Sequence, residues 1–442
     1  MLWLKRKSKN EIYPIASHKL EEQSDSSSKQ TIIALALITA LCLAGDAMLY
    51  IVLPTQWKEI GLTSLVQVGM LLSINRFVRL PLNPLIGYIY KKVNFRKVIL
   101  IAVVLSGIST VGYGIVADFR IWIILRATWG IAWALFKLGG YLLILQLSTD
   151  TNRGNLVGTY NGLFNLGSLV GMLIGGFFAD LFGLKIISIV LGTLAFFCIS
   201  FVFKYIPKAI YTNENQVKKV KTSLIRNLKI NMNKTIVKIL FTALLFNMLL
   251  MGMLTAILSH IIDIKLTNEI ELVGIVIGAA TVAGIIQALR WGVLPFITPK
   301  VGSILDKTKQ KNTLLEVFLV CSAIFLFLIP LPIHLGIWLP ILFINLIIAS
   351  IINTIIDSII TDCASRVNNK VFIMTIYAIV VDFGSALGPI TGYIMEQKVG
   401  LANLFWISAG VSLLLSLFWL LTSSKANVEN NSSQSNLITK NK

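Results

Sequence analysis

The sequence predicts an all-α polytopic membrane protein with twelve transmembrane helices in two related halves of six. Three observations predict this fold class: the composition, the spacing of long apolar segments, and an internal repeat. The chain of 442 residues is 56% hydrophobic and 13% charged, with a mean hydropathy of +0.80. Soluble globular proteins are about 45–50% apolar and about 25% charged. A chain this apolar is expected in a lipid bilayer.

Twelve apolar segments are long enough to cross the hydrocarbon core, which takes about 20 helical residues. They begin near Thr31, Leu65, Lys97, Ile121, Asn155 and Lys185, and then near Ile236, Leu272, Thr313, Gly336, Val371 and Leu401. The expected organisation is a tail (1–30), an N-terminal half (31–206), a basic linker (207–235), a C-terminal half (236–422) and a second tail (423–442).

The distribution of basic residues predicts the orientation. Of the 39 Lys and Arg residues, 29 fall in the tails, the linker and the loops on the same side, five in the opposite loops and five inside spans. Lys and Arg concentrate on the cytoplasmic side of membrane proteins. We therefore expect cytoplasmic termini in a multi-pass protein of a plasma or bacterial inner membrane. Because the basic residues lie between apolar segments and not on a solvated domain, nucleic-acid binding is not expected.

The two halves carry matching residues. Arg76 and Gly87 of the second span correspond to Arg290 and Gly302 of the eighth, with one residue inserted between them. The fifth and eleventh spans match at a constant offset of 217: Tyr160, Asn165, Gly167, Ser168, Gly171 and Gly175 correspond to Tyr377, Asp382, Gly384, Ser385, Gly388 and Gly392. Parallel six-helix repeats place a substrate site between them near the bilayer midplane.

These features together resemble the major facilitator superfamily, particularly its bacterial drug and metabolite exporters, over residues 31–422. The family's loop motif after span 2 corresponds to residues 87–97, with Lys91 at the acidic position, and its span 4 motif to Arg126 and Gly130. Its glycine-rich antiporter motif appears in span 5, with Met172 where proline is usual. The resemblance implies conformational gating by Gly87, Gly302, Asp306, Lys307, Gly167, Gly171 and Gly175.

Asp46, Arg126 and Asp382 are the candidate proton-coupling residues. A charge inside a membrane span is costly and therefore a functional candidate. Counted from Thr31 at 1.5 Å per residue, Asp46 lies roughly 8 Å from the outer boundary of the hydrocarbon core, and Arg126 lies at about the same depth. The alternatives are a fixed structural ion pair for Asp46, and neutralisation of Asp382 by Arg290 or by protonation.

The candidate substrate-binding residues are Arg76, Arg79, Asn165, Arg290 and Trp133. Arg76 and Arg79 are three residues apart and share a helix face. Arg76 is roughly 16 Å from Gly87 along the helix, which is mid-membrane. Arg79 could instead extend its guanidinium to the cytoplasm, and Trp133 could be a packing residue. Arg290 and Asn165 are candidates because of the internal repeat, in which Arg290 corresponds to Arg76 and Asn165 to Asp382.

The sequence therefore predicts a secondary active transporter that exports a small organic molecule in exchange for protons. Five basic residues against two clearly embedded acids favour an anionic cargo, such as a carboxylate metabolite or siderophore. Multidrug exporters, nutrient importers and a non-transporting receptor or scaffold are the alternatives. No GxxxxGK[ST] motif, HxxxxD or DxD cluster, CxxC pair or multi-histidine set occurs, so we expect no ATP hydrolysis, enzymatic activity, metal site or cofactor. The expected partners are the cargo, protons and the bilayer, with the protein a monomer.

Overall fold

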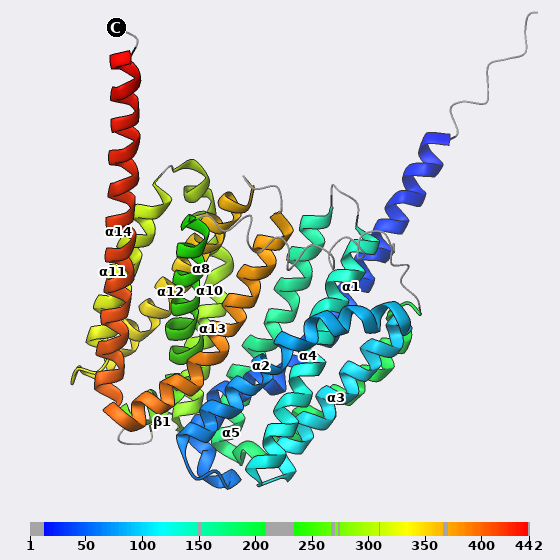
Figure 1. The fold of residues 1–442 in the computed structure, drawn as a ribbon. Helices are drawn as coiled ribbons and strands as arrows, with labels where there is room; N and C mark the ends of the chain where they lie inside the picture. Colours follow the sequence, from blue (N-terminus) through cyan, green and yellow to red (C-terminus); the bar gives the residue numbers. More distant parts are fainter. Residues whose placement is uncertain are drawn as a thin grey trace, which may run out of the picture.

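The computed structural model describes residues 13–148, 152–208, 234–266, 270–272, 275–308, 310–365 and 370–440. In the N-terminal half these form α1 (Tyr13–Gln56), a short 3-10 helix η1 (Trp57–Ile60), α2 (Leu65–Lys92), α3 (Phe95–Ile115), α4 (Phe119–Leu147) and α5 (Arg153–Tyr205). In the C-terminal half they form α8 (Lys234–Phe246), η2 (Asn247–Met253), α9 (Leu254–Lys265), β1 (Ile270–Leu272), β2 (Ile275–Ile277), α10 (Ala279–Lys307), α11 (Lys311–Leu328), α12 (Leu335–Ser365), α13 (Lys370–Val399) and α14 (Leu401–Lys440). Figure 1 shows the two groups of helices side by side.

Eleven stretches of helix in the described chain are long and apolar enough to cross a membrane. One of them, Asn155–Tyr205, has 51 residues. A straight helix of that length would extend about 77 Å, far beyond a ~30 Å hydrocarbon core. The chain reverses at Gly183, whose φ of 80° is a conformation that glycine adopts without a steric cost. α5 therefore supplies two spans, its first arm before Gly183 and its second arm after it, and the predicted count of twelve is confirmed.

Gln56 at the end of α1 stabilises this reversal. Its side-chain amide donates to the Ala179 carbonyl at 2.8 Å and accepts from the Leu184 amide at 2.7 Å. Because these two backbone groups lie on opposite sides of Gly183, one side chain ties both arms of α5 to α1.

The two ends of the molecule are distinguished by the termini. The start of α1 and the end of α14 lie at the top of Figure 1, and β1 lies at the bottom. We call these the terminal end and the hairpin end. The predicted start of the eighth span near Leu272 is wrong: β1 and β2 pair antiparallel there, and the helix begins at Ala279. The linker at 209–233, named above within 207–235, lies outside the described residues.

The glycine spacing packs the first arm of α5 directly against α1. A Cβ atom on Gly167 would lie 2.1 Å from the Ala40 carbonyl oxygen, and one on Gly171 would lie 2.2 Å from that of Ala44. A Cβ atom on Gly175 would lie 2.5 Å from the Met48 side chain. Of these three glycines, expected to gate, Gly167 and Gly171 therefore bring two backbones together within one half, as small residues do in membrane helices, and Gly175 leaves room for a side chain.

The C-terminal half repeats this packing with one irregularity. Gly384, Gly388 and Gly392 of α13 meet Leu244, Met248 and Met253 of the seventh span. Leu244 and Met248 stand 204 positions after their counterparts Ala40 and Ala44 in α1. Met253 stands 205 positions after its counterpart Met48. The extra residue falls in η2, a π-helix over Asn247–Met253. The wider π turn accommodates the insertion, so that Gly392 meets Met253 as Gly175 meets Met48.

Candidate substrate and proton site

A cavity of about 370 Å³ lies between the two halves. Helices of both halves line it, and its size is within the range of pockets that hold small organic ligands. Tryptophan and phenylalanine supply part of the wall through Trp129, Trp133, Phe164 and Trp291. The polar lining residues are Asp46, Tyr50, Asn75, Arg76, Arg79, Asn165 and Ser168 from the N-terminal half and Asn247, Thr255, Gln287, Arg290, Asn353 and Ser385 from the C-terminal half.

Asp46 and Arg126 form an ion pair at the edge of this cavity, as their equal depth predicts. Arg126 is fully buried and also donates through Nε to the Leu71 carbonyl at 2.8 Å. The Asn75 amide lies 3.5 Å from the same Asp46 oxygen. Asp46 lines the cavity, whereas Arg126 does not. A solute in the cavity can therefore contact the Asp46 carboxylate, whereas Arg126, which neutralises that carboxylate, is not exposed to the cavity.

Arg76 joins the two halves across the cavity. Its Nη1 donates to the Ser385 carbonyl of α13 at 2.6 Å. Its guanidinium carbon lies 5.6 Å from the centre of the Tyr50 ring, and that of Arg126 lies 6.0 Å from the same ring. An aromatic face attracts a cation at this distance. Tyr50, which the sequence analysis did not identify, therefore attracts the guanidinium groups of both Arg76 and Arg126.

The other predicted substrate residues also line the cavity. Trp133 packs edge-on against Phe164, with ring centres 5.5 Å apart, beside Asn165. Arg290 donates from Nε and Nη2 to the Ser350 hydroxyl at 3.1 and 3.0 Å. In the described part of the chain, no carboxylate oxygen lies within 4.0 Å of the Arg76, Arg79 or Arg290 guanidinium. Within the described residues, the cavity therefore carries three guanidinium groups that have no carboxylate oxygen within 4.0 Å.

Asp382 is placed differently from the other candidates. It is not among the residues that line the cavity, and Arg290, its suggested partner, donates to Ser350 and Met251. Asp382 interacts electrostatically with Arg79 and Lys137, which belong to the other half. The pairing with Arg290, one of the alternatives given for Asp382, is therefore not observed in the described structure.

Three further polar side chains were missed by the sequence analysis. Asn75 Oδ1, both amide atoms of Gln287 and Trp291 Nε1 are buried and have no hydrogen-bond partner in the described structure, as is also true of Arg79 Nε. All four residues line the cavity. Buried polar atoms are nearly always hydrogen-bonded in folded proteins, so these atoms are available to a solute or to water. A lone amide in an apolar span, as at Gln287, was the available signal.

The two halves meet at the hairpin end. Asp180 of α5 accepts hydrogen bonds from the Thr281 amide at 2.8 Å and from its hydroxyl at 2.5 Å, at the first turn of α10. A Cβ atom on Gly69 of α2 would lie 2.6 Å from the Pro389 carbonyl oxygen of α13. The two halves thus contact each other through α5 with α10 and through α2 with α13. We call these contacts the hairpin-end seal.

The predicted gating residues near the terminal end make no such contact. A Cβ atom on Gly87 or Gly302 would have no neighbour within 4 Å in the described part of the molecule. Lys307 is exposed, and the side chain of Asp306 lies outside the described set. The halves are therefore in contact at the hairpin end, and among the described residues Gly87 and Gly302 make no contact between them.

Comparison with known proteins agrees with this architecture. The sequence matches the family described as Major Facilitator Superfamily over residues 35–367 and 296–440. The multidrug resistance protein MdtG of Yersinia enterocolitica is 23% identical over 333 residues, which cover 73% of this chain and 75% of that protein. The quinolone resistance protein NorA of Staphylococcus aureus is 26% identical over 140 residues, covering 32% of this chain and 36% of NorA. The chain thus matches only about a third of NorA's length.

Solved transporter structures share the fold. A bacterial homologue of the human lysosomal transporter Spinster, in an inward-facing and occupied conformation, superposes with a TM-score of 0.69 at 15% identity, over 89% of this chain and 96% of that one. The nucleoside transporter NupG gives a TM-score of 0.66 at 13% identity, over 89% and 98%. With twelve spans, two repeated halves and a family match over most of its length, the chain belongs to the Major Facilitator Superfamily of membrane transporters.

Proposed function

We propose that the protein is a secondary active transporter that exports a small organic anion in exchange for protons by alternating access. The observation that carries the proposal is the central cavity: among the described residues, no carboxylate lies within 4.0 Å of Arg76, Arg79 or Arg290, and Asp46 is already paired with Arg126. Such an excess of positive charge within the membrane-spanning region favours an anionic solute.

The lining also supports a cargo with an aromatic or broad apolar part. Trp129, Trp133 and Phe164 lie on the N-terminal side of the cavity and Trp291 on the C-terminal side. Indole rings offer flat faces for stacking and an N–H for hydrogen bonding. An aromatic carboxylate or sulfonate would pair its charge with a guanidinium and its ring with a tryptophan.

Proton coupling is assigned to Asp46 and Arg126, with Asp382 as the second candidate. A carboxyl group beside a guanidinium favours its ionised form, whereas an unpaired carboxyl group in a dry site favours its protonated form. Separating the pair on one side of the membrane and re-forming it on the other would therefore load and release one proton per cycle.

Export as the direction is supported by the relatives, since MdtG and NorA are named as resistance proteins. With cytoplasmic termini, the hairpin-end seal would close the outside, and the cargo would enter from the cytoplasm. No chemical conversion of the cargo is needed, so we infer a transporter that is not an enzyme.

The proposal is tested with purified protein in liposomes that have an acidic interior. The probes are 1-naphthalenesulfonate and a naphthyltrimethylammonium salt, which share an aromatic ring and carry fixed opposite charges. Exchange for outgoing protons should concentrate the sulfonate inside, and dissipating the pH gradient should release it. Accumulation of the ammonium probe alone would disprove the anion preference. Uptake only when the exterior is acidic would show cotransport in place of exchange.

A further inference from the structure

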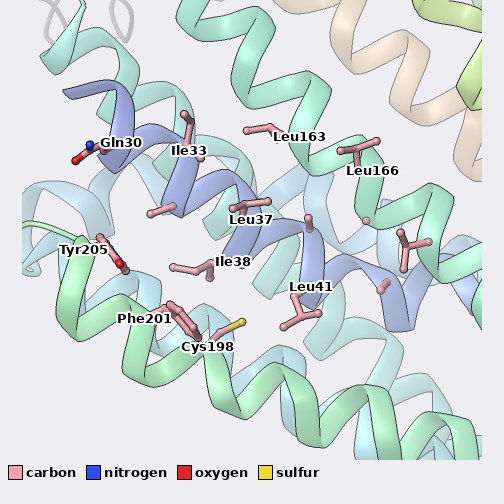
Figure 2. Close-up of a pocket in the computed structure, with 15 residues that line it drawn as sticks. Gln30, Ile33, Leu37, Ile38, Leu41, Leu163, Leu166, Cys198, Phe201 and Tyr205 are labelled. Atoms are coloured by element: carbon pink, nitrogen blue, oxygen red, sulfur yellow. The ribbon is translucent and has the colours of Figure 1, made fainter. Parts of the chain in front are cut away.

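A second cavity lies on the membrane-facing surface of the N-terminal half. It has a volume of about 760 Å³ and shares no lining residue with the central cavity. Its walls come from α1, from the first arm of α5 and from the second arm, as Figure 2 shows for Leu37, Leu166 and Phe201. We call it the α1–α5 groove.

The groove owes its depth to small residues on its floor. Gly167 packs on the Ala40 backbone, and Ala44 lies one turn further along α1. The larger flanking side chains remain open to the surroundings: Leu37 is 51% exposed, Leu166 49% and Phe201 53%. A hollow with apolar walls in a membrane surface is filled by apolar chains, because water there would have no hydrogen-bond partners.

The length and polarity of the groove match one leaflet. From Gln30 to Ala44 the α1 wall is about 21 Å long, and half of a ~30 Å hydrocarbon core is about 15 Å. The two side chains with polar groups at its mouth, Gln30 and Tyr205, lie toward the same end in Figure 2, which is the terminal end of the molecule. The apolar remainder extends from there toward the middle of the membrane.

The mouth carries positive charge. Lys29 precedes Gln30 and is exposed, and Lys204 precedes Tyr205 and is exposed. The Lys204 ammonium lies 5.2 Å from the centre of the Tyr205 ring. No Asp or Glu is among the described residues that line the groove. Basic side chains at this level attract anionic lipid head groups.

We propose that the α1–α5 groove binds one anionic phospholipid of the leaflet at the terminal end. One acyl chain lies along the floor over Ala40 and Gly167, and the head-group phosphate lies between Lys29 and Lys204. Because every lining residue belongs to α1 or α5, the lipid stays with the N-terminal half throughout the transport cycle. Its binding is therefore independent of the cargo.

The test is native mass spectrometry of the full-length protein, exchanged into detergent with equal amounts of phosphatidylglycerol and phosphatidylcholine of identical acyl chains. The wild-type protein should retain one phosphatidylglycerol in preference to phosphatidylcholine. Lys29→Gln and Lys204→Gln should each reduce that preference about fivefold, the effect of one basic side chain near an anionic surface. Ala34→Phe, which fills the groove, should abolish retention of both lipids.

Two matched controls accompany these variants. Lys92→Gln removes an exposed lysine whose ammonium lies 4.7 Å from the Tyr88 ring, outside the groove. Gly410→Phe adds the same ring at a position with open space on α14. Both controls should behave as wild type. Equal retention of the two lipids by wild type would overturn the proposal. An unchanged preference for phosphatidylglycerol in both lysine variants would also overturn it, and this result holds even if Ala34→Phe fails to fold.

Discussion

Asp180 in the first arm of α5 holds Thr281 at the start of α10 through two hydrogen bonds to one carboxylate oxygen, of 2.8 and 2.5 Å. The two residues belong to different halves and are 101 positions apart. The carboxylate also lies at a helix N-terminus, where the free N–H groups and the helix dipole favour negative charge. This contact is one component of the hairpin-end seal, and alternating access requires that it break.

Asp180→Ala is therefore expected to shift the population toward a state open at the hairpin end. Loss of hydrogen bonds to a charged group costs about 1.5 kcal/mol, which is roughly a tenfold change in the ratio of the two states. Spin labels at Lys58 and Asn403, exposed positions in opposite halves, would report longer distances. Asp118→Ala is the control, since Asp118 caps α4 within one half. An unchanged distance distribution would exclude Asp180 from the seal.

Asp46→Asn should abolish proton-driven accumulation while retaining part of downhill exchange. Asparagine keeps the shape of the side chain and its contact with Arg126 but cannot exchange a proton at neutral pH. The liposome assay with an imposed pH gradient measures this. Asp362→Asn removes an acid from an ion pair with Lys311 away from the cavity and should leave accumulation intact. If Asp46→Asn concentrates the probe like the wild-type protein, coupling lies elsewhere and Asp382 is tested next.

Arg76→Ala should lower the apparent affinity for the naphthalenesulfonate probe about tenfold or more, because hydrogen bonds to charged groups contribute about 1.5–3 kcal/mol. Arg76→Lys should restore it poorly, since an ammonium lacks the planar fork of donors. Arg96→Lys is the matched control: Arg96 Nε also donates to a carbonyl at 2.6 Å, that of Ile206, within one half. Full function of Arg76→Lys would argue against a paired-donor site.

Gly171→Ala should destabilise the fold by about 1–3 kcal/mol, because its Cβ would lie 2.2 Å from the Ala44 carbonyl oxygen. Gly162→Ala, nine residues earlier in α5, meets nothing within 4 Å and should gain up to about 1 kcal/mol of helix propensity. Thermal melting of the purified variants in detergent separates the two. Similar melting temperatures would show that α1 and α5 can move apart.

The terminal end is expected to face the cytoplasm, because basic residues dominate its tails and loops. Reporter fusions at position 215 and at Lys265 should therefore report opposite compartments. The same compartment for both would contradict the twelve-span topology.

Most spans could be predicted from the apolar segments, because a transmembrane helix can be identified from its length and hydropathy alone. The predicted start of the eighth span, Leu272, lies seven residues before the observed start at Ala279. The apolar segment after Leu272 contains β2, and periodicity does not distinguish a short apolar strand from the start of a helix. The Asp46–Arg126 pair followed from depth along two helices. The pairing of Asp382 did not, because Arg79 and Lys137 belong to the other half, and contacts between halves depend on how far the halves are closed.

The glycine motif at Gly167, Gly171 and Gly175 could be identified from the sequence, but its contact with α1 could not. Spacing by four residues predicts a helix face, but only the structure shows that this face meets α1. Asn75 was missed for a similar reason: its importance lies in its contact with Asp46 and in its unpaired Oδ1, which no sequence pattern reveals. Gln287 could have been found as a lone amide in an apolar span.

The reversal at Gly183 has a consequence for synthesis of the protein. The two arms of α5 are joined by one residue, so no polar loop is available to remain in water between them. Neither arm can span the bilayer while the other remains in water, so the two arms must insert into the membrane together as a helical hairpin. A truncation ending just after Gly183 should therefore fail to integrate its last span.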